Sequence, residues 1–321
     1  MTPKVALASA RTFPHHRSGW GYALHAIKPL LTPGGVWLDP FIEETFNWNL
    51  AENVAQGILP YQDSWVGIVH NPPGIPRWHE FDSAPENILA LPVWQQSIGH
   101  CRGLFTFSET MRDWLAARVA VPVEALIHPT EAADQVFQME AFMASPERRI
   151  IQVGSWMRRL NSIALLPVTN LRRTCLLLKP DVQSLVQRER ENEDWARAAN
   201  WSGVELIPYL DAAAFDTLLA RNIVFLDLYD TVVNNTVLEC IVRGTPLVCN
   251  RLPALVELLG EEYPLFFTSS LQEAAAKAED LDLIARAHEH LMRIPKKMFT
   301  GEAFAESIAN SSIYRALPVV G

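Results

Sequence analysis

The chain has 321 residues, 49% of them hydrophobic and 20% charged, and a formal net charge of −9. This composition excludes a disordered chain, and the length leaves room for two globular domains. Basic residues occur only as local pairs, so we do not expect a nucleic-acid partner. No apolar run approaches the roughly 20 residues of a membrane helix, and the N-terminus lacks the pattern of a signal peptide. We therefore expect a cytoplasmic protein without a transmembrane segment.

Eleven short apolar segments recur along the chain, several of them continuous rather than alternating, as is typical of strands covered on both faces. They predict strands at residues 4–10, 34–40, 65–70, 103–108, 124–129, 149–155, 174–179, 204–210, 222–229, 245–250 and 264–267. Helical patterns fall between them at 21–31, 108–119, 182–200, 211–222, 234–244 and 270–281. This alternation predicts an α/β fold with parallel sheets.

Residues 132–149 break the rhythm and are the best candidate for a linker. Two units of similar size follow from this, 1–135 and 145–300. The last segment, 301–321, has a helical pattern that could end the second unit or join the first.

The four cysteines, Cys101, Cys175, Cys240 and Cys249, have no metal-ligand spacing. We expect buried, reduced thiols and no metal site.

Ligands of parallel α/β sheets bind beyond the carboxyl ends of the strands, so the residues after each strand are the candidates for a site. After the first strand, Gly19 lies in a turn that enters a helix, where backbone amides could approach an anion or simply form a turn. After the third strand, His70 begins a proline-rich loop. It could make a positioned polar contact or be a surface histidine of a structural loop.

In the second half, Gly154 and Ser155 follow a buried strand, with Arg158 and Arg159 just beyond. Two guanidiniums beside exposed amides match what a diphosphate requires, although a solvated arginine pair is the alternative.

A second polar cluster follows the strand at 222–229. Asn234, Asn235 and Thr236 are helix-capping residue types, whose neighbouring amides can bind an anion. Glu239 lies one turn further on, where its carboxylate could accept hydrogen bonds from a ribose diol. Alternatively, Glu239 is a charged residue on a helix surface, although its neighbours are apolar.

At these residues the chain resembles the C-terminal half of GT-B glycosyltransferases, particularly the retaining, family 4-like group. The matching text is "LYDTVVNNTVLECIVRGTPLVCNR", with Glu239 at the second acid of the group's motif and "GTPLV" at its G-x-P-V-V. The segment "VGSWMRRLN" matches the group's glycine and basic pair. Two features depart from the pattern: Asp230, at the first acid, precedes Glu239 by nine residues rather than eight, and Arg158 and Arg159 are adjacent rather than separated.

The resemblance implies a GT-B fold, in which two Rossmann-like domains with parallel sheets face a central cleft. The N-terminal domain would be the acceptor side, and the C-terminal domain would bind the nucleotide-sugar. The implied reaction moves a sugar from a nucleotide-diphosphate sugar to an unknown acceptor, with retention and without metal or cofactor. The acceptor could be a saccharide, a lipid-linked glycan, a protein or a small molecule.

The resemblance also implies roles for individual residues. Arg158 and Arg159 would stabilise the diphosphate, helped by the amides near Asn235 and Thr236, and Glu239 would bind the ribose. His70 would contact the transferred sugar. The remaining donor-site candidates are Gly19, Gly154, Ser155, Asp230 and Asn234, and the acceptor-site candidates are Trp78 and His79.

Two other functions fit the same frame. A sugar-nucleotide epimerase or hydrolase would need no acceptor, and a catalytically degenerate GT-B chain could serve as a binding or scaffold subunit. A nicotinamide dehydrogenase is disfavoured, because no GxGxxG follows the first strand of either unit.

Overall fold

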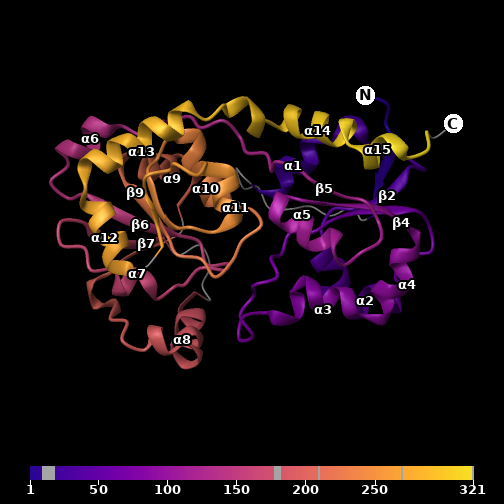
Figure 1. Cartoon of the computed structure of the whole chain (residues 1–321), viewed down its shortest axis with the longest axis horizontal. Helices are drawn as coiled ribbons and strands as arrows, with labels where there is room; N and C mark the ends of the chain where they lie inside the picture. The colour runs from indigo at the N-terminus through magenta and orange to yellow at the C-terminus, as the bar shows by residue number, and fades with distance from the viewer. Residues whose placement is uncertain (9–18, 177–181, 209, 269, 320–321) are drawn as a thin grey trace. The chain divides into compact units, whose positions relative to one another are not determined.

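The computed structural model describes residues 1–8, 19–176, 182–208, 210–268 and 270–319. The chain forms two parallel α/β units (Figure 1). Each of the eleven predicted strands has a counterpart among the described residues, and the ends of those predicted at 4–10, 174–179 and 204–210 lie partly outside them. The predicted fold class is thus confirmed. No helix in the described part of the chain has the length and apolar character needed to cross a membrane.

The first unit comprises Met1–Glu131, Asp230–Val233 and Lys297–Gly321. Its sheet has the order β1-β2-β3-β4-β5, with β1 (Val5–Leu7), β2 (Val36–Asp39), β3 (Trp65–Ile68), β4 (Cys101–Thr106) and β5 (Val123–Ala125). Its α-helices are α1 (Trp20–Ala26), α2 (Leu50–Ala55), α3 (Pro85–Ala90), α4 (Pro92–Ser97), α5 (Glu109–Ala116), α14 (Gly301–Asn310) and α15 (Ser312–Ala316).

The C-terminal helices belong to the core of this first unit. Figure 1 shows α14 and α15, at the yellow end of the chain, beside α1 and the first sheet. Phe304 and Ile313 are buried there. Lys4 ties the two ends of the chain together, because its Nζ donates to the carbonyls of Tyr314 (3.2 Å) and Leu317 (2.8 Å) at the end of α15.

The second unit comprises Ala132–Tyr229 and Asn234–Lys296. Its sheet has the order β11-β10-β9-β6-β7-β8, with β6 (Arg149–Val153), β7 (Arg172–Leu176), β8 (Glu205–Ile207), β9 (Ile223–Leu226), β10 (Leu247–Asn250) and β11 (Phe266–Phe267). Its α-helices are α6 (Met139–Ala144), α7 (Ser162–Leu165), α8 (Val182–Asn192), α9 (Ala212–Arg221), α10 (Asn235–Arg243), α11 (Pro253–Leu259), α12 (Leu271–Glu279) and α13 (Leu281–Arg293).

The strand order of the second unit fixes where a ligand can bind. From β6 the chain builds outward through β7 and β8, then returns to place β9 on the other side of β6. The sheet therefore has a topological switch point between β6 and β9, and a crevice at such a point lies beyond the carboxyl ends of the two strands. The segments after β6 and β9 meet there, since Arg158 and Leu228 form an isolated β-bridge.

Several elements differ in detail from the sequence expectation. The segment 132–149, predicted as a linker, contains α6, and Phe142 of this helix is fully buried. The helix predicted at 182–200 ends at Asn192. Helices α3, α4 and α11 each begin with a proline, a start signal that does not depend on a long hydrophobic repeat. All four cysteines are buried and none forms a disulfide, as expected.

The first sheet offers a direct test of its β1–β2 pairing. A Cβ placed on Gly35 would lie 2.7 Å from the backbone oxygen of Lys4, and this backbone cannot move without disturbing β1. We expect Gly35→Ala to lower the free energy of unfolding by about 1–3 kcal/mol, measured by urea unfolding. Gly99→Ala is the matched control, because nothing lies within 4 Å of its added methyl group. Equal effects of the two substitutions would contradict the pairing.

Candidate functional site

After β6 the chain makes a tight turn that brings the side chain of Arg158 back to the end of the strand. Gly154 has φ 79°, in the left-handed region that favours glycine. A Cβ at this position would also lie 3.0 Å from Nη2 of Arg158. The turn therefore requires glycine for two reasons, and it delivers Arg158 to the switch point.

The guanidinium of Arg158 is enclosed by neutral acceptors. Its Nε donates to the carbonyl of Val153 (3.1 Å) and its Nη1 to that of Trp156 (2.6 Å). Its Nη2 donates to Oδ1 of Asn234 (3.2 Å) and Oγ1 of Thr236 (3.0 Å). In the described ranges no carboxylate pairs with it, and the residue is 8% exposed. Burial lowers the pKa of Arg158 to about 10, so it remains a cation at neutral pH.

This cation lies at the N-terminus of α10. Asn234 is the N-cap, and its Oδ1 also accepts from the amide of Thr236 at 3.0 Å. Helix N-termini carry partial positive charge and favour anions. The structure thus brings together Gly154, Arg158, Asn234 and Thr236, which the sequence places about 80 positions apart in two groups. A buried cation without an acidic partner, next to a helix N-terminus, is suited to an anion.

Arg159 lies in a different environment from Arg158. Its side chain is 41% exposed, and its Nε is 3.9 Å from Oδ1 of Asp227. The guanidinium carbon lies 5.1 Å from the ring centroid of Tyr229 and 5.8 Å from that of Trp195. One arginine of the predicted pair is therefore enclosed and the other is accessible to solvent.

Asp227 directly follows β9 and is 6% exposed. Burial raises its pKa to about 7; the nearby Arg159 lowers it and the nearby Glu189 raises it. Glu189 itself accepts from the amides of Leu160 (3.0 Å) and Asn161 (2.7 Å). Its Oε1 also accepts from the hydroxyl of Tyr229 at 2.8 Å. The surroundings of the Arg159 guanidinium thus include the Asp227 carboxyl group, whose pKa lies near neutral pH.

This titration predicts a pH-dependent stability effect. The folded pKa of Asp227 is about 7 against an ordinary value of 3.8, so the folded state binds the proton more tightly and loses stability as pH rises between these values. Asp227→Asn cannot ionise and avoids this loss. We compare the free energy of unfolding of the variant with that of wild type, measured by urea unfolding. We expect the difference in favour of the variant to be about 1–2 kcal/mol larger at pH 8 than at pH 5. Exposed Asp282→Asn is the control, with similar effects at both pH values. A reversed difference would contradict the assignment.

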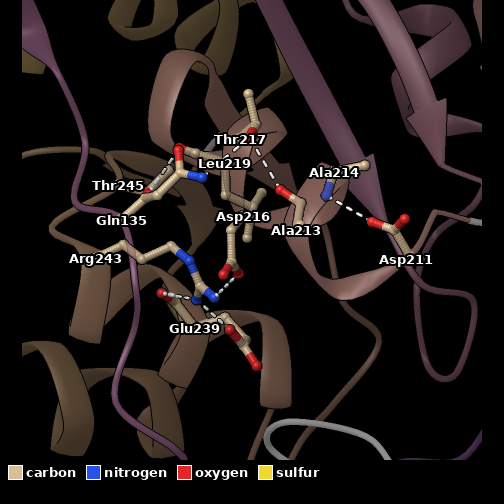
Figure 2. A network of polar contacts seen from close by, with 10 residues as sticks. All are labelled: Gln135, Asp211, Ala213, Ala214, Asp216, Thr217, Leu219, Glu239, Arg243 and Thr245. Carbon is tan, nitrogen blue, oxygen red and sulfur yellow. Dashed lines mark hydrogen bonds and ion pairs between the residues drawn. The ribbon is translucent and has the colours of Figure 1, made fainter.

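Glu239 lies inside α10 in a separate polar network (Figure 2). One of its oxygens pairs with Arg243, one turn further along the helix, and the same guanidinium pairs with Asp216 of α9. Glu239, Arg243 and Asp216 are only 2%, 0% and 1% exposed, respectively. Figure 2 shows the Arg243 guanidinium lying between the two carboxylates. The acid predicted to bind ribose is therefore enclosed in this network, and an exposure of 2% leaves it no access to a ribose.

Arg243 is the largest fully buried charged side chain of α10. Arg243→Met keeps the length of the side chain and removes the guanidinium that both carboxylates contact. We expect a loss of about 3–5 kcal/mol in the free energy of unfolding, because breaking a buried pair leaves charge uncompensated.

The control for this substitution is Arg293→Met, whose side chain is 78% exposed and pairs with Glu289 on a helix surface. It should change stability by less than about 1 kcal/mol. If the two variants were equally stable, the Asp216–Arg243–Glu239 network would not support α10.

Asp230 is engaged within the first unit. Its Oδ2 accepts from the amide of Gly74 at 2.9 Å, and its Oδ1 accepts from the amide of Thr231 at 2.8 Å. A Cβ on Gly74 would lie 2.6 Å from that Oδ2, so the loop approaches the carboxylate as only glycine permits. Burial raises the pKa of Asp230. This carboxylate, predicted as a donor contact, is thus used to hold the loop after β3.

His70 begins that loop and is surrounded by aromatic rings. Its ring centroid lies 4.6 Å from Trp20, 4.2 Å from Phe41 and 5.1 Å from Phe107. Its Nε2 is 2.9 Å from the carbonyl of Pro40. A carbonyl only accepts, so Nε2 carries the hydrogen and Nδ1 is an acceptor. Burial lowers the pKa of His70 to about 3, which keeps it neutral.

Glu43 fixes the backbone at His70. It is fully buried, and its Oε1 accepts from the amides of His70 (2.7 Å) and Asn71 (2.6 Å). Its Oε2 has no hydrogen-bond partner among the described residues. Burial raises the pKa of Glu43 to about 7. Glu43 is not among the site residues predicted from the sequence. Because Glu43 follows the second predicted strand, the rule that residues after a strand are site candidates would have selected it, as it selected His70.

The remaining predicted residues are scattered. Trp78 and His79 lie further along the loop after β3, with ring centroids 5.3 Å apart, and His79 is 4% exposed. Gly19 is the N-cap of α1 with φ −87°, a conformation open to any residue. The residue before it lies outside the described ranges. Ser155 lies in the turn after β6, and Asn235 is the first residue of α10.

The chain is similar to several solved structures, whereas no family model and no curated protein sequence matches it. One is a sucrose-phosphate synthase from Thermosynechococcus elongatus (13% identity, TM-score 0.61), with 92% of this chain and 76% of that chain covered.

A second is an E. coli protein described as trehalose-6-phosphate bound with UDP-2-fluoro glucose (12% identity, TM-score 0.60), with 99% and 100% covered. A third is a trehalose-6-phosphate synthase from work on enzymatic glycosyl transfer with retention (14% identity, TM-score 0.54), with 93% and 79% covered. These likenesses show that the chain has the GT-B fold.

Proposed function

We propose that the chain is a glycosyltransferase that uses a nucleotide-diphosphate sugar as its donor. The observation that carries this proposal is the buried guanidinium of Arg158 at the N-terminus of α10, which has no acidic partner in the described ranges. The GT-B fold supports it, as does the structural neighbour described with UDP-2-fluoro glucose.

The reaction asks the site to stabilise a leaving group rather than to activate a strong base. The bond between the anomeric carbon and the diphosphate oxygen breaks, a bond to the acceptor oxygen forms, and the hydroxyl proton passes to the leaving diphosphate. Negative charge grows on that diphosphate as its bond to the sugar breaks. Fixed cations and helix amides stabilise such charge without reorganising, which is the most effective form of electrostatic catalysis.

The two arginines divide this work. Arg158 holds the end of β6 against α10 through its contacts to Asn234 and Thr236, and contributes a fixed positive charge. Arg159 is the accessible guanidinium and reaches the phosphate oxygens directly. A forked guanidinium can make two parallel hydrogen bonds to a phosphate. Glu239 is 2% exposed within the Arg243 network, so we assign it to positioning α10 rather than to the ribose.

In the first unit, His70 is neutral with Nδ1 as its acceptor atom, so it can accept a hydrogen bond from a hydroxyl of the transferred sugar. This role needs no protonation at neutral pH. We further propose retention of configuration without a metal, as in the family 4-like group that the sequence resembles. The neighbour from work on glycosyl transfer with retention supports the stereochemical part.

The test is calorimetric binding of UDP, GDP and ADP and of UDP-glucose, GDP-mannose and ADP-glucose. We expect one base to bind, and Arg159→Gln to weaken that binding by about tenfold or more, the contribution of a charge-assisted hydrogen bond. Arg221→Gln is the matched control. It removes an exposed arginine at the end of α9. This residue lies just before β9 begins, at the end of the sheet opposite to the carboxyl ends of the strands.

Product analysis by mass spectrometry separates the competing functions. Free sugar or an isomerised donor in the absence of an acceptor would favour the hydrolase or epimerase. Binding of a nucleotide without turnover of any donor would favour the scaffold subunit. Absence of binding by every nucleotide, or equal binding by wild type and Arg159→Gln, would contradict the donor site itself.

A further inference from the structure

Glu189 belongs to neither polar segment of the candidate site, yet both segments contact it. It lies in α8 and is 0% exposed. Its contacts reach Leu160 after β6 and Tyr229 after β9, which are 29 and 40 positions away in the sequence. A buried carboxylate requires hydrogen-bond donors, so the donors that surround Glu189 show which parts of the chain it holds.

Both oxygens of Glu189 accept from the chain directly after Arg159. Oε1 accepts from the amide of Leu160 (3.0 Å) and Oε2 from the amide of Asn161 (2.7 Å). The side-chain amide of Asn161 also donates to Oε2 (2.8 Å) and to the carbonyl of Val186 in α8 (3.0 Å). Two successive backbone amides bound by one carboxylate fix the position and the orientation of a peptide segment. Glu189 therefore limits where the backbone of Arg159 can lie.

The same carboxylate also holds the segment after β9. Its Oε1 accepts from the hydroxyl of Tyr229 at 2.8 Å, and the ring centroid of Tyr229 lies 5.1 Å from the guanidinium carbon of Arg159. Backbone hydrogen bonds join the two segments. The amide of Arg159 donates to the carbonyl of Asp227 (2.8 Å), and the amide of Tyr229 donates to that of Met157 (3.0 Å). Glu189 thus contacts both the backbone that carries Arg159 and the ring beside its guanidinium.

Arg159 depends on such support more than Arg158 does. Four hydrogen bonds hold the guanidinium of Arg158. In contrast, Nε of Arg159 has no hydrogen-bond partner among the described residues and lies 3.9 Å from Oδ1 of Asp227. Its side chain is 41% exposed and lies near the rings of Tyr229 and Trp195. The position of this guanidinium is therefore set largely by its backbone and by these rings.

We propose that Glu189 is a positioning residue of the donor site, which holds the segment after β6 and Tyr229 so that the Arg159 guanidinium can reach the diphosphate. The proposal rests on the glycosyltransferase function above. In this role Glu189 touches no substrate and acts through Arg159. A cation that is held in place before the ligand arrives need not be ordered during binding, so loss of Glu189 weakens binding of the nucleotide.

The sign of the effect separates positioning from a simple effect of charge. A carboxylate near a diphosphate repels it, so removal of the charge alone would tighten nucleotide binding. Glu189→Gln also replaces one acceptor oxygen with an NH2 group, which cannot accept from a backbone amide. Burial raises the pKa of Glu189, and its four hydrogen-bond donors oppose this shift. Because those donors already balance the carboxylate, we expect the lost contacts to dominate and binding to weaken.

The test is calorimetric binding of UDP, GDP and ADP to the full chain. For the nucleotide that binds to wild type, we expect Glu189→Gln to weaken binding about fivefold or more, as the loss of one or two buried hydrogen bonds would. Glu279→Gln is the matched control. Glu279, in α12, also accepts from two successive backbone amides, those of Thr169 and Asn170. These precede β7, at the end of the sheet opposite to the carboxyl ends of the strands, so this variant should bind the nucleotide as wild type does.

Two further variants separate positioning from a general loss of stability. Tyr229→Phe removes one donor to Glu189 and keeps the ring beside Arg159, and we expect about two- to threefold weaker binding with little change in the urea midpoint. In an Arg159→Gln background, Glu189→Gln should have less than about a twofold effect, because the residue through which it acts is absent. A merely structural role would give the same factor in both backgrounds.

Three results would overturn the proposal. They are unchanged or tighter nucleotide binding by Glu189→Gln, an equal loss in Glu279→Gln, and equal factors for Glu189→Gln with and without Arg159. Should Glu189→Gln fail to fold, unchanged binding by Tyr229→Phe would overturn it instead. A wild-type chain that binds no nucleotide contradicts the donor function itself. A wild-type chain that binds nucleotide but gives any of these results keeps its donor function and loses only the role of Glu189.

Discussion

The enclosed guanidinium of Arg158 is the contact on which the proposed donor site depends. Removing a guanidinium from water is costly, and here the cost is offset by four neutral acceptors rather than by a carboxylate. Those acceptors come from the end of β6 and the start of α10, so the cation fixes one segment against the other. Among the described residues no acid pairs with this guanidinium, so its charge is available to an anionic ligand. A carboxylate at the position of Asn234 would give a stronger internal bond and a weaker anion site.

The helix that receives this cation is itself held at its other end. Arg243, in the last turn of α10, joins Glu239 of the same helix to Asp216 of α9, and Gly244 ends the helix with φ 68°. Guanidiniums therefore restrain α10 at both ends. A rigid helix keeps its first amides in place before a ligand arrives, which avoids the cost of ordering them during binding. The buried charges of this unit are better understood as positioning devices than as sources of stability.

Sequence patterns predicted the eleven strands of the described residues because a parallel strand covered on both faces is a short, nearly continuous apolar run in the sequence. The rule that ligands bind beyond the carboxyl ends of parallel strands selected the polar residues after β6 and β9, and the family resemblance assigned them to one site. Sequence patterns could not separate Arg158 from Arg159, since burial of Arg158 depends on Asn234 and Thr236, which lie 76 and 78 positions away. A cavity at the carboxyl end of β2 in the first unit also escaped prediction, because its wall includes the π-helix at Glu44–Trp48, whose period matches neither a strand nor an ordinary helix.

Arg158 and Arg159 are neighbours in the chain, yet the fold gives them different environments. Arg158 is 8% exposed and its guanidinium meets neutral acceptors, whereas the side chain of Arg159 is 41% exposed and its Nε lies 3.9 Å from Asp227. A fixed cation beside a helix N-terminus favours an anion without reorganising, and an exposed guanidinium can form a forked pair of hydrogen bonds with phosphate oxygens. Under the proposed function, the first arginine therefore holds the shape of the site and the second contacts the donor.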